Sequence, residues 1–170
     1  MTTIIAELAT NHAGDMRLAE EMIRAAAGAG ADIVKTQGYQ IKHLRRTDAQ
    51  YDWFKQCELS EKDHLRLMAV AEDSGVRYLS TGYTVTDLNR LQQIGLTRVK
   101  IGSGEGTTHL VNEAIARFTE VYVTLAWGHA PIGLIPPEHK HYVTWFATVP
   151  IYPAPIETFS RIVKQVGYSD

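Results

Sequence analysis

The chain has 170 residues, of which 45% are hydrophobic and 21% are charged, a mixture typical of one globular domain with a real core. This composition excludes a disordered chain. The formal net charge is −2 and no basic block occurs, which argues against nucleic acid or an anionic membrane as a partner. We expect no signal peptide and no membrane span, and we expect the single cysteine, Cys57, to be buried in a cytoplasmic protein.

Short apolar and β-branched runs alternate along the chain with amphipathic stretches. The runs predict six strands and a seventh, at residues 3–6, 31–35, 76–80, 98–101, 120–125, 142–149 and 166–169. The stretches between them predict helices over residues 16–28, between Ser60 and Gly75, and over residues 85–94, 109–117 and 156–165. The polar segment 38–50 and the proline-rich segment 127–141 predict connections without a regular helix.

This alternation predicts an α/β fold in which parallel strands are joined by helical crossovers. It fits both an open doubly wound sheet and a closed barrel. In either case ligands bind at the carboxyl ends of the strands, where we expect Glu7, Lys35, Thr81 and Lys100. The chain has no G-x-G-x-x-G and no P-loop motif, which weakens a nucleotide-binding function.

Lys35 and Lys100 each end an apolar strand, and a buried ammonium is costly unless it meets an anion. One interpretation is an ion pair with Glu7 or Glu105. The other is a multiply charged ligand, favoured because segments 80–82 and 102–105 place hydroxyl and backbone N–H groups where phosphate oxygens bind.

Glu7 has two interpretations of similar weight: a general base that also orients a sugar hydroxyl, or a structural partner of Lys35. His12 fits a ligand-binding role less well than a hydrogen bond within its loop. We expect His43 and His64 on the surface. A cluster of His129, His139 and His141 lacks the usual helical spacing of metal ligands, so a metal role there is the weaker interpretation; in all, we predict no metal-binding residues.

Eight motifs, in order along nearly the whole chain, resemble those of the sialic acid synthase family. They are IIAE at 4–7, NHAGD at 11–15, AGADIVKTQ at 29–37, ELSEKDH at 58–64, LST at 79–81, KIGSGE at 100–105, YPAP at 152–155 and GYSD at 167–170. The resemblance implies a TIM-type (β/α)8 barrel, here truncated after the seventh strand. It also implies that residues 1–170 form the barrel domain and lack the family's C-terminal antifreeze-like domain.

The resemblance further implies an enzyme, a cytoplasmic transferase of sialic acid biosynthesis and a possible homodimer. Such an enzyme condenses phosphoenolpyruvate with an amino sugar similar to N-acetylmannosamine, forms a nonulosonic acid and releases phosphate. Glu7 and Glu105 would be catalytic, handling the sugar and the attacking water. The residues that would bind phosphoenolpyruvate are Lys35, Gln37, Thr81, Lys100, Ser103, Tyr152 and Ser169.

Several features depart from the family pattern. The family uses Mn²⁺ or Mg²⁺, and its histidine ligands would lie beyond Asp170. Segment 124–127 replaces the family's STGM motif, and Pro150 stands where a serine or asparagine is usual. We therefore interpret the chain as a fragment of a longer barrel, although a partner chain could also complete it. The alternative functions are a related synthase for another aldose, and a non-catalytic barrel that binds a phosphorylated ligand.

Overall fold

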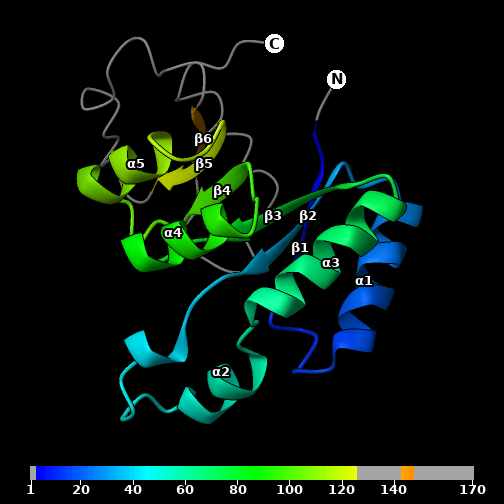
Figure 1. Ribbon diagram of the computed structural model, residues 1–170, viewed down its shortest axis with the longest axis horizontal. Coiled ribbons are helices and arrows are strands. Elements are labelled where there is room, and N and C mark those ends of the chain that lie inside the picture. The colour runs from blue at the N-terminus through cyan, green and yellow to red at the C-terminus, as the bar shows by residue number, and fades with distance from the viewer. Residues whose placement is uncertain (1–2, 126–142, 148–170) are drawn as a thin grey trace.

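The computed structural model describes residues 3–125 and 143–147, which form an α/β fold built on one parallel sheet (Figure 1). Six strands follow one another in sequence order across the sheet, each paired in parallel with the next. They are β1 (Ile5–Ala9), β2 (Ile33–Gln37), β3 (Arg77–Thr81), β4 (Arg98–Ile101), β5 (Glu120–Leu125) and β6 (Val143–Ala147). An unbroken sequence order is the topology of a barrel wall, because each crossover then returns to the adjacent position.

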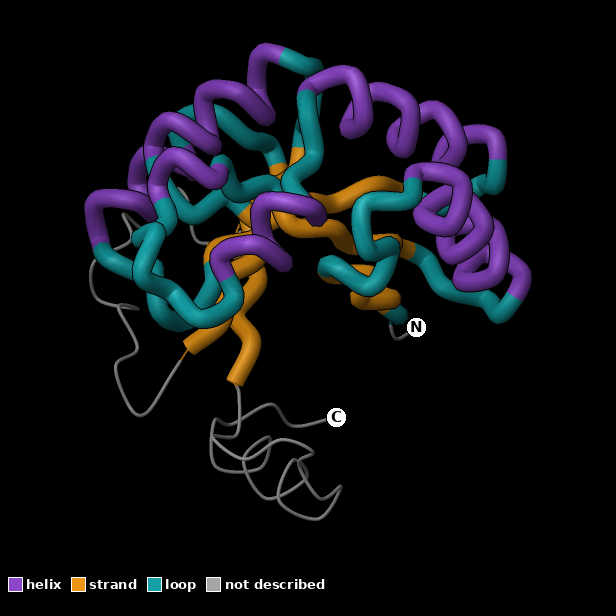
Figure 2. The backbone as a smooth tube through the Cα atoms, turned by 90° about the horizontal axis from the view of Figure 1, so that it is seen from below, coloured by secondary structure: helices purple, strands orange, loops and turns teal. Residues whose placement is uncertain are grey.

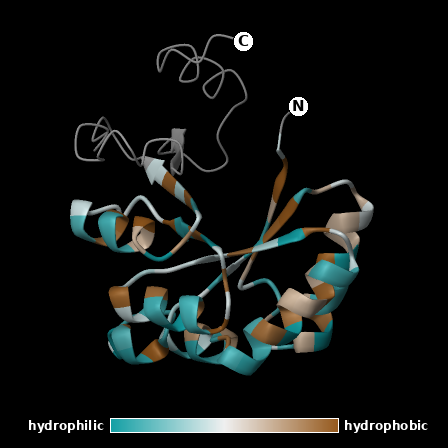
Figure 3. Ribbon diagram, turned by 45° about the horizontal axis from the view of Figure 1, so that its top comes forward, coloured by the Kyte–Doolittle hydropathy of each residue, from teal (hydrophilic) through white to brown (hydrophobic). Residues whose placement is uncertain are grey.

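The helices form an arc over one side of the strands, and no described helix covers the other side (Figure 2). They are α1 (Met16–Gly28), the single 3-10 turn η1 (Ile41–His43), α2 (Tyr51–Cys57), α3 (Glu61–Asp73), α4 (Val85–Gln93) and α5 (Thr108–Ile115). Hydrophobic and hydrophilic residues alternate along these helices (Figure 3), as expected where one face packs on a sheet and the other meets water. Within the described residues, no helix has the length and apolarity needed to cross a bilayer.

Side-chain caps fix where helices α1, α3, α4 and α5 begin. The Asp15 carboxylate accepts hydrogen bonds from the backbone N–H groups of Arg17 and Leu18, as the predicted cap requires. Ser60 and Asp63 form the predicted capping box, in which each side chain accepts from the other residue's backbone N–H. A third side-chain cap, at Thr84, opens α4. The helix starts predicted at residues 16 and 85 are thereby confirmed.

The predicted elements differ from the observed ones at several points that bear on the site. Strands β1 and β2 run further along the chain than predicted, so Glu7 and Lys35 lie within strands and not at their ends. Helix α2 lies between the predicted elements and was not predicted. The predicted helix 156–165 and strand 166–169 lie outside the described residues, so closure into a barrel stays a prediction.

The inner face of the sheet, away from the helices, is organised in levels because paired residues of parallel strands point to the same side. A small apolar cluster of Ile33, Leu79 and Tyr122 occupies the middle of this face, with Ile5 packed against it. The larger core lies between the sheet and the helices, and its fully buried side chains include Ile23, Leu67, Leu88 and Leu91. Both faces of the sheet are thus apolar over much of their area, as expected for parallel sheets.

A buried polar network lies on the helix side of β2 and β3. The Tyr78 hydroxyl lies 2.9 Å from Nδ1 of His64 and 2.6 Å from the Thr36 hydroxyl, which in turn donates to Ser80 at 3.4 Å. Our surface assignment of His64 is therefore wrong: its side chain is fully buried. Cys57 is buried as predicted, and His43 is exposed as predicted.

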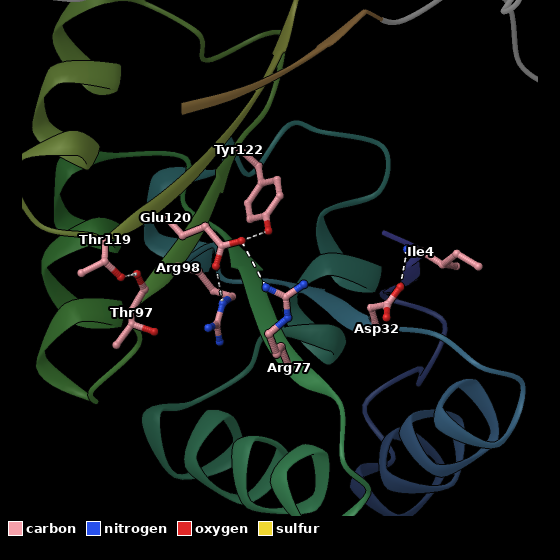
Figure 4. Close-up of polar contacts among 8 residues, drawn as sticks. All are labelled: Ile4, Asp32, Arg77, Thr97, Arg98, Thr119, Glu120 and Tyr122. Carbon is pink, nitrogen blue, oxygen red and sulfur yellow. Dashed lines mark hydrogen bonds and ion pairs between the residues drawn. The ribbon is translucent and has the colours of Figure 1, made fainter. Parts of the chain in front are cut away.

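Glu120 joins the amino ends of strands β3, β4 and β5 (Figure 4). Its carboxylate accepts from Arg98 at 3.0 Å, lies 3.4 Å from Nη1 of Arg77, and accepts a hydrogen bond from the Tyr122 hydroxyl. Burial would raise the pKa of this carboxyl, but the hydrogen bonds from Tyr122 and Arg98 outweigh burial and hold the pKa below its ordinary value.

We predict that Glu120→Gln lowers the free energy of unfolding of the chain by about 1 kcal/mol at pH 7, because the two arginines lose their anion. A lowered pKa in the folded state means that this stabilisation is complete above the ordinary value of 4.5 and disappears as the pH falls through the folded value. Urea unfolding of both proteins from pH 7 to pH 3 measures this.

The control is Glu113→Gln, which removes the same charge from an i, i+4 pair with Arg117 on one helix. It should cost only a few tenths of a kcal/mol. An equal loss in both variants, or a loss for Glu120→Gln that persists at pH 3, would contradict the proposed contribution of Glu120.

Candidate active site

The carboxyl ends of the first four strands bring four predicted site residues onto one face. Glu7 pairs with Lys35 across β1 and β2, and Thr81 pairs with Lys100 across β3 and β4. Gln37 pairs with Thr81, so it lies at the same level. The predicted gathering of these side chains at this edge of the sheet is confirmed by the register, because residues paired in parallel strands project to the same side.

Lys35 is the best-anchored of these residues. Its Nζ lies 2.6 Å from Oε2 of Glu7 and donates to the Thr81 hydroxyl at 2.8 Å, and the residue is 9% exposed. The other oxygen of Glu7 accepts from the backbone N–H of Ala9 at 3.0 Å. The expected ion pair with Glu7 is therefore present. An ammonium has three donors, and these contacts leave one for a ligand.

The ammonium group of Lys100 is bound by a backbone carbonyl and repelled by the charge of Lys35. Its Nζ donates to the carbonyl of Ile101 at 3.0 Å. Burial, and after it the charge of Lys35, lower the pKa of Lys100 to about 8, although Glu7 and Glu105 oppose both effects. Two ammonium groups that repel each other gain most from an anion that contacts both.

The loop after β4 carries Glu105 back toward the strand. A Cβ atom built on Gly102 would collide with a carboxylate oxygen of Glu105, so the absence of a side chain at Gly102 permits this approach. Ser103 lies exposed in the same loop, with its hydroxyl open to solvent. Glu105 therefore lies close enough to affect the pKa of Lys100.

The loop after β2 passes tightly over the end of β3. The N–H of Gly38 donates to the carbonyl of Thr81 at 2.9 Å, and a Cβ on Gly38 would lie 2.9 Å from the Ser80 hydroxyl and 3.0 Å from that carbonyl. Any larger residue at Gly38 would push the two loops apart. This contact keeps Gln37 beside Thr81.

His12 has the favoured of its two predicted roles, a hydrogen bond within its loop. It is buried and its Nδ1 accepts from the backbone N–H of Gly14 at 3.1 Å, so it fixes its loop. Ala9 and Ala13 flank it with φ of 48° and 49°, in the left-handed region that L-residues rarely adopt. The hydrogen bonds within this turn hold that backbone in place.

Some predicted site residues lie outside the described residues. These are Tyr152 and Ser169; the histidines His129, His139 and His141, for which a metal role was the weaker interpretation, also lie there. Among the residues that are described, no group of three or more His, Cys, Asp or Glu side chains is arranged to hold a metal ion.

Sequence reasoning missed an aromatic pocket beside these residues. Tyr39, Phe54 and Tyr83 line it, together with Gln37 and Glu105. Tyr39 lies two positions after Gln37, and Tyr83 lies two positions after Thr81. This spacing from predicted site residues could have indicated that both tyrosines lie near the site. Phe54 comes from the unpredicted helix α2, and no spacing in the sequence marks it.

Relatives of known class are similar in sequence over much of the chain. The N,N'-diacetyllegionaminic acid synthase of Legionella pneumophila is 38% identical over 61% of this chain and 33% of its own length. The enzyme of the same name from Campylobacter jejuni is 30% identical over 99% of this chain and 60% of its own length. The chain thus spans less than two thirds of these curated relatives.

The fold is also found in a solved structure, the N-acetylneuraminic acid (sialic acid) synthetase of Leptospira borgpetersenii. It superposes with a TM-score of 0.85 at 24% identity, over 96% of this chain and 60% of that one. This likeness confirms an α/β fold with a parallel sheet, as in TIM-barrel synthases. Residues 22–160 match the NeuB family. The resemblance found in the motifs is therefore confirmed, and the chain belongs to the NeuB family.

Proposed function

We propose that this chain carries the phosphoenolpyruvate site of a nonulosonic acid synthase, which condenses phosphoenolpyruvate with an amino sugar and releases phosphate. The observation that carries the proposal is a pair of lysines on the inner face of a parallel sheet, the buried Lys35 and the half-buried Lys100. Membership of the NeuB family and the similarity to nonulosonic acid synthases support the reaction class.

Phosphoenolpyruvate carries a carboxylate and a phosphate, and the two lysines offer a cation for each. In our proposal Lys35 and Gln37 bind the carboxylate, while Lys100, Thr81 and Ser103 bind the phosphate. Lys35 keeps its position without ligand because Glu7 and Thr81 hold it. Such preorganised charges bind an anion without first paying to order the side chains. Tyr152 and Ser169 stay predicted members of this site.

The proposed reaction balances with water as the third reactant. The methylene carbon of phosphoenolpyruvate forms a bond to the sugar aldehyde carbon, whose oxygen takes a proton from solvent. Water then attacks the electron-deficient carbon that bears the phosphate and gives one proton to Glu105. Phosphate leaves as its C–O bond breaks, and the new hydroxyl releases the second proton to solvent as the ketone forms. Glu7 is bound to Lys35 through one oxygen and to Ala9 through the other, which suits orientation of the lysine and a sugar hydroxyl.

Mn²⁺ or Mg²⁺ remains a proposed cofactor, taken from the family resemblance. Its expected histidine ligands are not among the described residues. Those residues contain no group of three or more His, Cys, Asp or Glu side chains that could bind a metal ion. No step proposed for this chain's residues passes through the ion.

Replacement of Lys100 tests the phosphate site. We predict that Lys100→Ala weakens phosphoenolpyruvate binding by about 100-fold or more, because the phosphate loses its main cation. Isothermal titration calorimetry measures the affinity. Lys55→Ala, which removes an exposed lysine of α2, is the matched control and should bind as the unaltered chain does. Equal affinity in all three proteins would remove Lys100 from the site.

The pH dependence of binding follows from the low pKa of Lys100. Because its pKa is about 8 in the free chain, phosphoenolpyruvate must meet a largely deprotonated amine at higher pH. We predict that affinity falls about tenfold from pH 7 to pH 9, and that binding near pH 8 takes up a proton. Calorimetry in buffers of different ionisation enthalpy detects that proton. In Lys100→Arg this decline should vanish, and its persistence would assign the titration to another group.

Glu105→Gln tests the proposed base. The rate of phosphate release from phosphoenolpyruvate, measured with N-acetylmannosamine and Mn²⁺, should fall about 10²- to 10⁴-fold, while phosphoenolpyruvate affinity stays unchanged. Glu61→Gln removes the same charge from an exposed position at the start of α3 and should leave both quantities unaltered. A variant at Glu105 with full activity would exclude its role as base.

A further inference from the structure

One arginine on helix α4, Arg90, binds the backbone of two other segments. Its Nη1 donates to the carbonyl of Leu59 at 3.0 Å. Its Nη2 donates to the carbonyls of Gly38 at 2.9 Å and Tyr39 at 3.4 Å. The half-buried guanidinium thus connects α4 with the loop that leaves β2 and with the turn between α2 and α3.

The residue type follows from the groups that Arg90 binds. Gly38, Tyr39 and Leu59 are buried, and a buried carbonyl without a donor is costly. A guanidinium carries five N–H donors in a planar fork, so it can bind several carbonyls at once. The compact ammonium of a lysine cannot reproduce that arrangement.

Two carboxylates hold the same loop a little further along the chain. The side chain of Gln40 donates to Asp87 at 2.8 Å, and the backbone N–H of Ile41 donates to Glu58 at 3.1 Å. Asp87 and Arg90 lie three positions apart on α4, so this helix binds the loop twice. The path of the chain after β2 is therefore set by charged side chains outside the sheet.

Gly38 transmits this hold to the candidate site. Its carbonyl accepts from Arg90, and its N–H donates to the carbonyl of Thr81 at 2.9 Å. Gln37 directly precedes it, and the Thr81 hydroxyl accepts from Lys35. The bond from Arg90 therefore helps to fix Gln37 beside Thr81 and Lys35.

We propose that Arg90 is a positioning residue, which holds Gln37 where it can bind the carboxylate of phosphoenolpyruvate; this inference rests on the proposed function. Arg90 acts through the backbone of Gly38 and does not touch the ligand. It lines a separate outer cavity with Ser60 and Glu61. Its effect is therefore confined to the carboxylate half of the site.

The test titrates phosphoenolpyruvate and inorganic phosphate separately into each protein. Arg90→Ala should weaken phosphoenolpyruvate binding by about tenfold, as expected when a hydrogen bond to a charged group is misplaced. The affinity for inorganic phosphate should stay unchanged, because in our proposal Lys100, Thr81 and Ser103 bind it.

Rescue distinguishes the hydrogen-bonding fork from a general effect on folding. Methylguanidinium added to Arg90→Ala should restore the affinity for phosphoenolpyruvate, whereas Arg90→Lys should recover only part of it. The matched control is Arg117→Ala, which removes another half-buried guanidinium, one that donates to Asn89 and to the carbonyl of Glu113. That variant should bind both anions as the unaltered chain does, with or without methylguanidinium.

Hydrogen exchange measures the hold on the loop without any ligand. The amide of Gly38 should exchange about tenfold faster in Arg90→Ala than in the unaltered chain. The amide of Gly82 donates to the carbonyl of Lys100 at 3.1 Å, in the corresponding position after β3, and should exchange at its original rate.

Three results would overturn the inference: an equal loss of phosphate affinity in Arg90→Ala, no recovery with methylguanidinium, or equal acceleration of exchange at Gly38 and Gly82. Failure of phosphoenolpyruvate to bind the unaltered chain would instead contradict the proposed function. Exchange at Gly38 would then still decide whether Arg90 holds this loop.

Discussion

The ammonium group of Lys35 connects three strands through two polar contacts, and the candidate site depends on it. A cation on the inner face of a parallel sheet is costly without an anion, so Glu7 on β1 and Thr81 on β3 must stay within reach. These contacts fix the relative height of the three strand ends. The parallel register then sets Gln37 and Lys100 at that height as well.

The inner face thus divides by chemistry along the strand direction. Near the amino ends Arg77 and Arg98 share the carboxylate of Glu120, and apolar side chains follow in the middle. At the carboxyl ends Lys35 is paired with Glu7, while Nζ of Lys100 donates to a backbone carbonyl and forms no ion pair with a described residue. A half-buried cation without a paired carboxylate is what marks this end as the candidate ligand site.

Local signals in the sequence were enough for much of the fold. The caps at Asp15 and Ser60 placed helix starts correctly, and β-branched runs placed β4 and β5 at their observed bounds. Helix α2 escaped prediction because its first residue follows Gln50, which makes no side-chain cap, and because the helix has only seven residues.

The sequence predicted the site residues that belong to the strands. It did not predict those that come together from segments far apart in the chain. Glu7, Lys35, Thr81 and Lys100 share one face of the sheet, as parallel pairing of the predicted elements required, although Glu7 and Lys35 lie within their strands. The strand bounds failed at β2 because Thr36 and Gln37 are polar, while backbone pairing with β3 decides where the strand ends. His64 shares a helix face with Leu67 and Ala71, and that spacing would have indicated its burial.

The contact between Tyr39 and Phe54 joins segments that are fifteen positions apart and defines the pocket only after folding. No local pattern could reveal it. Residues separated in this way come together through packing of α2 against the strand exits, and packing depends on the whole chain.

The buried network of His64, Tyr78 and Thr36 has a consequence for measurements of ligand binding. Burial, aided by the charge of Arg90, lowers the pKa of His64 to about 3, so its imidazole stays neutral throughout the physiological range. The joint between β2 and β3 therefore keeps the same protonation from mildly acidic to alkaline solution. The imidazole beneath Lys35 and Thr81 therefore does not change its charge in that pH range. A change of ligand affinity with pH then reports on the groups that face the ligand.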